Sequence, residues 1–116
     1  MVEALPNDKR NPLEMEINLF ISGGKLKDGQ HVSRSIDPQC IVFEKDNGSD
    51  DWRKIGHTEQ IKNTLNPEFK QAVQITYSFE RRQMLQFLFV DGDDFGDYDK
   101  IGEMHIALGK LMGNRT

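Results

Sequence analysis

The sequence has 116 residues and a formal net charge of −4, which suits one acidic domain with a core of its own. Its acidity argues against nucleic-acid binding, which needs a basic surface, and against unaided attachment to an anionic membrane. A single cysteine, Cys40, excludes an internal disulfide, and no apolar stretch approaches the roughly 18 residues of a membrane-spanning helix. Met1-Val2-Glu3 does not begin a signal peptide, so we expect a cytoplasmic protein.

The predicted elements are short strands separated by turns. Residues 1–12 contain two prolines and few apolar side chains, which indicates a flexible lead-in, and we take residues 13–116 as the domain. Residues 15–21 alternate between apolar and polar side chains, the pattern of a half-buried strand. Further strands are expected at about residues 40–44, 54–62, 73–79, 84–90 and 101–108, with a helical turn over 109–113.

The pattern as a whole favours an all-β fold. No apolar stripe with the helical period of 3.6 residues continues for three turns. Turn signals at Gly23-Gly24, Asn47-Gly48 and Asn66-Pro67 separate the strands. Six short strands spaced in this way predict an antiparallel sandwich or barrel.

The most distinctive segment follows the apolar run 85–90. Residues 91–99, Asp-Gly-Asp-Asp-Phe-Gly-Asp-Tyr-Asp, hold five carboxylates. Charges packed this closely repel one another, and a folded chain tolerates them mainly when solvent or a multivalent cation screens them. Carboxylate oxygens favour Ca²⁺ or Mg²⁺, although a solvated acidic turn would have the same composition.

Two familiar arrangements of aspartates do not fit this segment. An EF-hand loop that begins at Asp91 would place Phe95 and Gly102 where an acidic or amide residue and a glutamate are needed, and both flanks are predicted as strands. A phosphotransferase pair, with Asp91 as nucleophile and Asp93 as acid/base, would need a parallel α/β sheet and a later lysine and acidic group. We therefore predict no enzymatic activity and no small-molecule substrate.

A third arrangement fits several segments of the chain. Asp91-x-Asp93 followed by Asp99 resembles the third loop of the C2 domain, a calcium- and lipid-binding β-sandwich, and Ile36-Asp37-Pro38 resembles the family's Ser-Asp-Pro. The set of motifs is closest to that of the first C2 domain of the copines: Asp37-Pro38-Gln39-Cys40, Gly56-x-Thr58-Glu59-x-Ile61-x-Asn63, Asn66-Pro67-Glu68-Phe69 and Tyr77-x-Phe79-Glu80. The resemblance covers about residues 13–112.

The resemblance implies a Greek-key sandwich with calcium held by aspartates of two loops. A C2 domain has eight strands, and because six are predicted we expect the last two to be missing from this chain. The implied ligands are Asp37 from the first loop and Asp91, Asp93 and Asp99 from the third. The family usually has an aspartate six residues before Asp37, where this chain has His31, a poor calcium ligand. Asp28 could replace it if the longer loop folds inward, and Asp97 could join a second ion.

The resemblance also implies a function. At the apices of the two loops, Val32 and Phe95 occupy the positions that enter the bilayer in the family. The implied function is the calcium-dependent recruitment of a copine-like protein from the cytoplasm to anionic phospholipid, at the inner face of the plasma membrane or at other membranes. The alternative is a calcium-insensitive domain that acts as a scaffold for protein partners, which the altered first loop favours.

Overall fold

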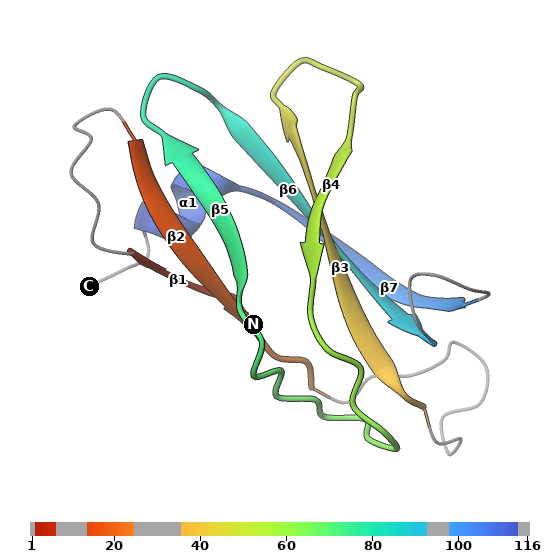
Figure 1. Ribbon diagram of the computed structural model, residues 1–116. Helices are drawn as coiled ribbons and strands as arrows, with labels where there is room; N and C mark the ends of the chain where they lie inside the picture. The colour runs from red at the N-terminus through yellow and green to blue at the C-terminus, as the bar shows by residue number, and fades with distance from the viewer. Residues whose placement is uncertain (1, 7–13, 25–35, 93–97, 114–116) are drawn as a thin grey trace.

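The computed structural model describes residues 2–6, 14–24, 36–92 and 98–113, which form two antiparallel β-sheets and one short helix (Figure 1). The three-stranded sheet has the order β1 (Val2–Pro6), β2 (Glu14–Ile21), β5 (Val73–Ser78). The four-stranded sheet has the order β4 (Arg53–His57), β3 (Pro38–Asp46), β6 (Gln83–Asp91), β7 (Asp99–Ala107). Helix α1 (Leu108–Gly113) follows β7. The predicted all-β antiparallel sandwich is therefore confirmed.

The hydrophobic core lies between the two sheets. Strand β2 contributes Ile17 and Leu19, and strand β6 contributes Leu85 and Phe87, all fully buried. Each buried side chain of this size stabilises the fold by about 1.5–3 kcal/mol. Leu108 of α1 joins the same cluster, so the short helix closes one side of the core.

Strand β6 occupies an internal position in the four-stranded sheet. It pairs with β3 along nine residues of register and with β7 on its other side. A strand with neighbours on both sides has no free edge, and its apolar side chains meet the core or the neighbouring strands. The ladder between β3 and β6 runs from Pro38 opposite Asp91 to Asp46 opposite Gln83, so each end of the ladder carries polar residues.

The N-terminal prediction was wrong for residues 2–6. Instead of a flexible lead-in, Val2–Pro6 form β1, which pairs antiparallel with β2, with Ala4 opposite Leu19. Ala4 is buried in the core cluster, so this strand adds to the packing. The described residues thus form seven strands where the sequence pattern predicts six; the expectation about missing final strands stays a prediction.

The third predicted strand is shorter than expected, because β4 ends at His57. Beyond it, backbone hydrogen bonds to β3 continue at separate points, because the N–H groups of Thr58 and Ile61 donate to the carbonyls of Cys40 and Pro38 at 2.9 and 3.0 Å, and side chains add further bonds. The Cys40 N–H donates to the Thr58 hydroxyl at 3.0 Å, and the Glu59 carboxylate accepts the N–H groups of Lys70 and Gln71 at 2.7 and 3.1 Å. These bonds hold residues 58–72 in an irregular connection to β5 rather than in a ladder. Among the described residues, no helix has the length and apolar character that crossing a membrane requires.

Candidate metal centre

Asp37 and Asp91 lie together at one end of the β3–β6 ladder. Asp37 directly precedes β3, and Asp91 is the last residue of β6, opposite Pro38 in the register. The Asp37 N–H donates to Asp91 Oδ1 at 2.9 Å, and the Gly92 N–H donates to the Asp37 carbonyl at 3.3 Å. The antiparallel pairing therefore unites two predicted ligands that are far apart in the sequence.

The connection between β4 and β5 supplies further contacts to Asp37. The Asn63 N–H donates to Asp37 Oδ1 at 2.8 Å, and the Gln60 side-chain amide donates to the Asp37 carbonyl at 3.3 Å. Asn63 has a φ of 59°, a left-handed conformation that asparagine tolerates better than most residues. The Lys62 Nζ lies 3.9 Å from Asp37 Oδ2. This part of the connection is thus attached to the start of β3.

The described hydrogen bonds to the two carboxylates use one oxygen of each. Oδ1 of Asp91 accepts the Asp37 N–H, and Oδ1 of Asp37 accepts the Asn63 N–H. A carboxylate has room for further partners on its second oxygen. Asp37 and Asp91 are both only partly buried, so these second oxygens are the atoms that could contact a hard cation.

Asp99 is the third predicted ligand that the structure describes. It is the first residue of β7 and lies opposite Asp91 in the β6–β7 register. Side chains directly opposite each other on antiparallel strands point to the same face, and like charges there destabilise the pairing. A bound cation would offset that repulsion. Among the described residues, however, no three acidic, histidine or cysteine side chains form a group that could hold a metal ion.

The remaining predicted site residues lie outside the described part of the chain. They are Asp28 and Val32 of the first loop and Asp93, Phe95 and Asp97 of the third, and the position of His31 lies outside as well. Their assigned roles stay predictions. The contacts that Gln60, Lys62 and Asn63 make with Asp37 were not predicted from the sequence. Asn63 belongs to one of the motifs that resemble the copines, but that motif by itself does not predict its contact with Asp37.

The strand behind Asp37 is held firmly. The Gln39 side-chain amide donates to the Thr58 carbonyl at 2.8 Å, and the Ile61 N–H donates to the Pro38 carbonyl at 3.0 Å. Cys40 is fully buried, and burial raises the pKa of its thiol to about 12. It therefore remains neutral and serves as a small core residue.

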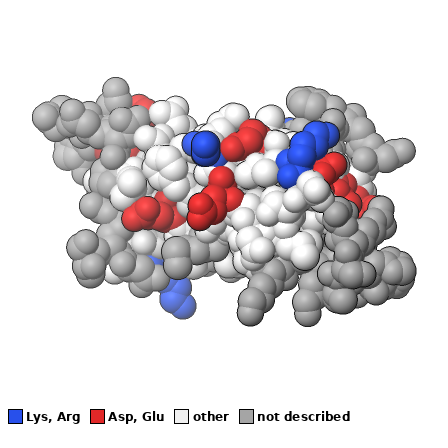
Figure 2. Space-filling view, turned by 90° about the horizontal axis from the view of Figure 1, so that it is seen from below, with Lys and Arg blue, Asp and Glu red and all other residues white. Residues whose placement is uncertain are grey.

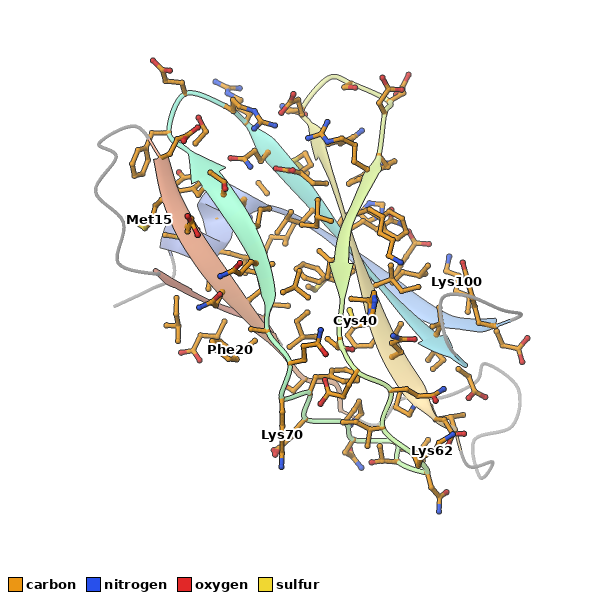
Figure 3. The ribbon with its side chains drawn as sticks, viewed as in Figure 1. Met15, Phe20, Cys40, Lys62, Lys70 and Lys100 are labelled. Atoms are coloured by element: carbon orange, nitrogen blue, oxygen red, sulfur yellow. The ribbon has the colours of Figure 1, made fainter. Side chains whose placement is uncertain are left out.

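The charges near this end are mixed. Figure 2 looks at the molecule from below and shows acidic and basic side chains side by side on the face that contains the β4–β5 connection. Figure 3 shows Lys62 and Lys70 at the lower edge of that connection, with Lys62 near the start of β3 and Lys70 farther from it. A bound cation would therefore change the balance of charge locally rather than across the whole surface.

The comparisons with known proteins agree with the motifs. A family model described as the C2 domain matches residues 16–116. The chain is 40% identical to Copine-D of Dictyostelium discoideum over 115 residues, which covers 90% of this chain and 22% of that protein. It is 46% identical to Copine-E of the same organism over 92 residues, which covers 75% of this chain and 16% of that protein. The chain thus spans about a fifth of the length of these curated relatives.

A solved structure supports the fold. The crystal structure of a C2 domain of RIM from Drosophila matches with a TM-score of 0.59 and 23% sequence identity, covering 93% of this chain and 85% of that one. At this identity the likeness shows the fold alone. Together with the family match and the two-sheet sandwich, it confirms the resemblance drawn from the motifs: this chain belongs to the C2 domain family.

Proposed function

We propose that this domain binds anionic phospholipid membranes in a calcium-dependent manner. The proposal assigns Asp37, Asp91 and Asp99, together with Asp93, to calcium binding. The observation that carries it is the hydrogen bond of 2.9 Å between the Asp37 N–H and Asp91 Oδ1, which joins the first and third loops at their inner ends. Membership of the C2 family supports it, because membrane binding that often depends on calcium is common in that family.

The side chains present fit a hard cation. They offer carboxylate oxygens, and Asp91 faces Asp99 across two strands at a cost that a positive charge would offset. Calcium, when bound, would cancel negative charge at this end and attract the phosphate groups of anionic lipids. The protein's own contribution is to position the two carboxylates, since the Asp37 N–H donates to the Asp91 carboxylate and the Asn63 N–H donates to the Asp37 carboxylate.

Membrane contact would also involve apolar side chains. We assign this role to Val32 and Phe95, on the resemblance to the family and outside the described residues. Burying one phenylalanine side chain is worth about 1.5–3 kcal/mol, which is too little for stable anchoring without the electrostatic attraction. The similarity to the copines supports a cytoplasmic protein that moves to membranes when calcium rises.

One observation favours a second candidate function, a calcium-insensitive scaffold for protein partners. The described residues alone do not bring three metal-ligating side chains together, and the first loop has His31 where the family usually has aspartate. On this alternative the carboxylates of Asp37 and Asp91 serve only to close the loops. The two functions differ in whether calcium changes membrane affinity.

Vesicle sedimentation separates the two functions. The chain is mixed with phosphatidylserine-containing or pure phosphatidylcholine vesicles, in calcium or in a chelator. We expect sedimentation with phosphatidylserine vesicles in calcium, and recovery in the supernatant under the other three conditions. Equal sedimentation with and without calcium, or none with either vesicle, would contradict the proposed function and favour the scaffold.

A further inference from the structure

Lys62 lies beside an oxygen that the proposed calcium site needs. Oδ1 of Asp37 already accepts the Asn63 N–H at 2.8 Å, which leaves Oδ2 as the oxygen for a cation. The Lys62 ammonium lies 3.9 Å from that Oδ2, from the residue adjacent to Asn63. The hydrogen bond of the Asn63 N–H therefore holds the backbone of Lys62 close to the Asp37 carboxylate. The Lys62 side chain is 77% exposed and can turn away from it.

We propose that Lys62 is an internal counter-ion of the candidate metal centre. Without calcium, its ammonium pairs with Asp37 Oδ2; when calcium binds, the ammonium is displaced and becomes available to anionic lipid. This inference rests on the proposed function and adds its regulation. One lysine thereby lowers the intrinsic calcium affinity and raises the lipid affinity of the calcium-bound form.

The charges of the neighbourhood make this exchange feasible. An exposed ion pair contributes little to stability, so its loss costs the protein little when calcium arrives. Two positive charges cannot share one carboxylate oxygen without strong repulsion, so the lysine and the calcium ion compete. Figure 3 shows Lys62 at the lower end of the molecule, near the start of β3, which is the end that the proposed function turns toward the membrane.

The chain offers a matched control for this idea. Lys70 lies in the same β4–β5 connection, and its substitution by glutamine changes the net charge by the same amount. Its backbone N–H donates to Glu59, a contact that a change of side chain preserves. Figure 3 shows Lys70 farther from the start of β3 than Lys62. Any general effect of lost positive charge should appear in both variants.

The test measures calcium affinity by calorimetry and vesicle affinity at saturating calcium for the wild type, Lys62→Gln, Lys62→Arg and Lys70→Gln. For Lys62→Gln we expect calcium affinity to rise about threefold without lipid, and affinity for phosphatidylserine vesicles to fall about fivefold. Lys62→Arg and Lys70→Gln should resemble the wild type in both measurements. Thermal melting checks that every variant is folded.

The outcomes separate the two proposals. A wild type that binds no calcium overturns the proposed function and this inference together. A wild type that binds calcium, with Lys62→Gln indistinguishable from Lys70→Gln, overturns this inference alone. Raised calcium affinity with unchanged vesicle affinity in Lys62→Gln also overturns it. Lys62 would then compete with calcium for Asp37 without contributing to lipid binding.

Discussion

Both ends of the β3–β6 ladder carry acidic residues, but the partners of their carboxylates differ. At the paired end, formed by Glu44, Asp46, Arg81 and Gln83, each carboxylate meets a basic or amide side chain. Arg81 donates through Nη2 at 2.6 Å and Nε at 3.0 Å to Asp46 Oδ1. The acidic end is formed by Asp37, Asp91 and Asp99. Its described hydrogen-bond donors are backbone N–H groups and one side-chain amide. The basic group described there is the Lys62 ammonium, whose Nζ lies 3.9 Å from Asp37 Oδ2.

Burial explains why the paired end needs its partners. The Glu44 side chain is only 9% exposed, and a buried carboxylate without partners is costly. Arg53 Nη2 lies 3.2 Å from Glu44 Oε1, and the Gln83 side-chain amide donates to Glu44 Oε2. The bond to Asp46 is the main reason that the pKa of Arg81 is raised. The paired end is therefore neutralised from within, whereas the acidic end retains negative charge, which the proposed calcium site would use.

Removing Gln83 should produce the largest loss of stability. Its buried amide accepts the Ser78 N–H and donates to the Thr76 carbonyl, both at 2.8 Å, besides contacting Glu44. Gln83→Ala leaves buried groups without partners, and we expect the free energy of unfolding to fall by about 3 kcal/mol in urea denaturation. Gln74→Ala, on the exposed side of β5, is the control. A loss below about 1 kcal/mol would show that the paired end is not built as described.

Asp91→Asn should affect calcium rather than stability. The asparagine oxygen can still accept the Asp37 N–H, so the loops stay joined, but one negative charge is lost. We expect calcium affinity, measured by calorimetry, to fall by about tenfold or more, which corresponds to about 1.4 kcal/mol. Asp50→Asn, in the exposed β3–β4 turn, makes the same change of net charge. Equal losses from both variants would indicate that only net charge matters.

The smallest effect is expected at Glu59, which organises the connection between the acidic end and β5. Burial opposes its ionisation, but the hydrogen bonds from the Lys70 and Gln71 N–H groups outweigh it, so its pKa is lowered from 4.5. A lowered pKa means that the carboxylate stabilises the fold above the unfolded-state pKa and loses that effect as the pH falls through the folded-state value. Because solvent screens this partly exposed carboxylate, we expect Glu59→Gln to lower the free energy of unfolding by only about 0.5 kcal/mol at pH 7.

Urea denaturation at several pH values checks this prediction. The difference between Glu59→Gln and the wild type should shrink as the pH falls from the ordinary pKa of 4.5 through the lower pKa of the folded wild-type carboxylate. Gln71→Ala keeps the backbone N–H and serves as the control. A difference that stays constant from pH 7 to pH 3 would exclude ionisation of Glu59 as its cause.

Patterns in contiguous residues predicted most of the sandwich. The alternation over residues 15–21 and the apolar run over residues 84–90 predict β2 and β6. The meeting of Asp37 and Asp91 was implied by the family's motifs, because no local pattern places two loops together. Once the register of β3 and β6 is set, that meeting follows from Pro38 lying opposite Asp91.

The features that the sequence did not reveal depend on distant partners. Strand β1 is five residues long and ends in Pro6, so it has little pattern of its own, and its pairing with β2 makes it a strand. Strand β4 ends at His57, where the regular ladder gives way to separate backbone bonds from Thr58 and Ile61 to β3 and to side-chain bonds of Thr58 and Glu59. The contact between Asn63 and Asp37 joins residues 26 apart, which periodicity cannot detect.

A calcium titration followed by ¹H–¹⁵N NMR tests the central contrast most directly. We expect shifts in the amide signals of Asp37, Asn63 and Gly92, whose N–H groups donate to oxygens of Asp37 and Asp91 at the acidic end. The amides of Asn47 and Ser78, which donate to Arg82 and Gln83 at the paired end, should keep their positions. Equal shifts at both ends, or none at the acidic end in millimolar calcium, would contradict the claim that one end binds a cation and the other is neutralised from within.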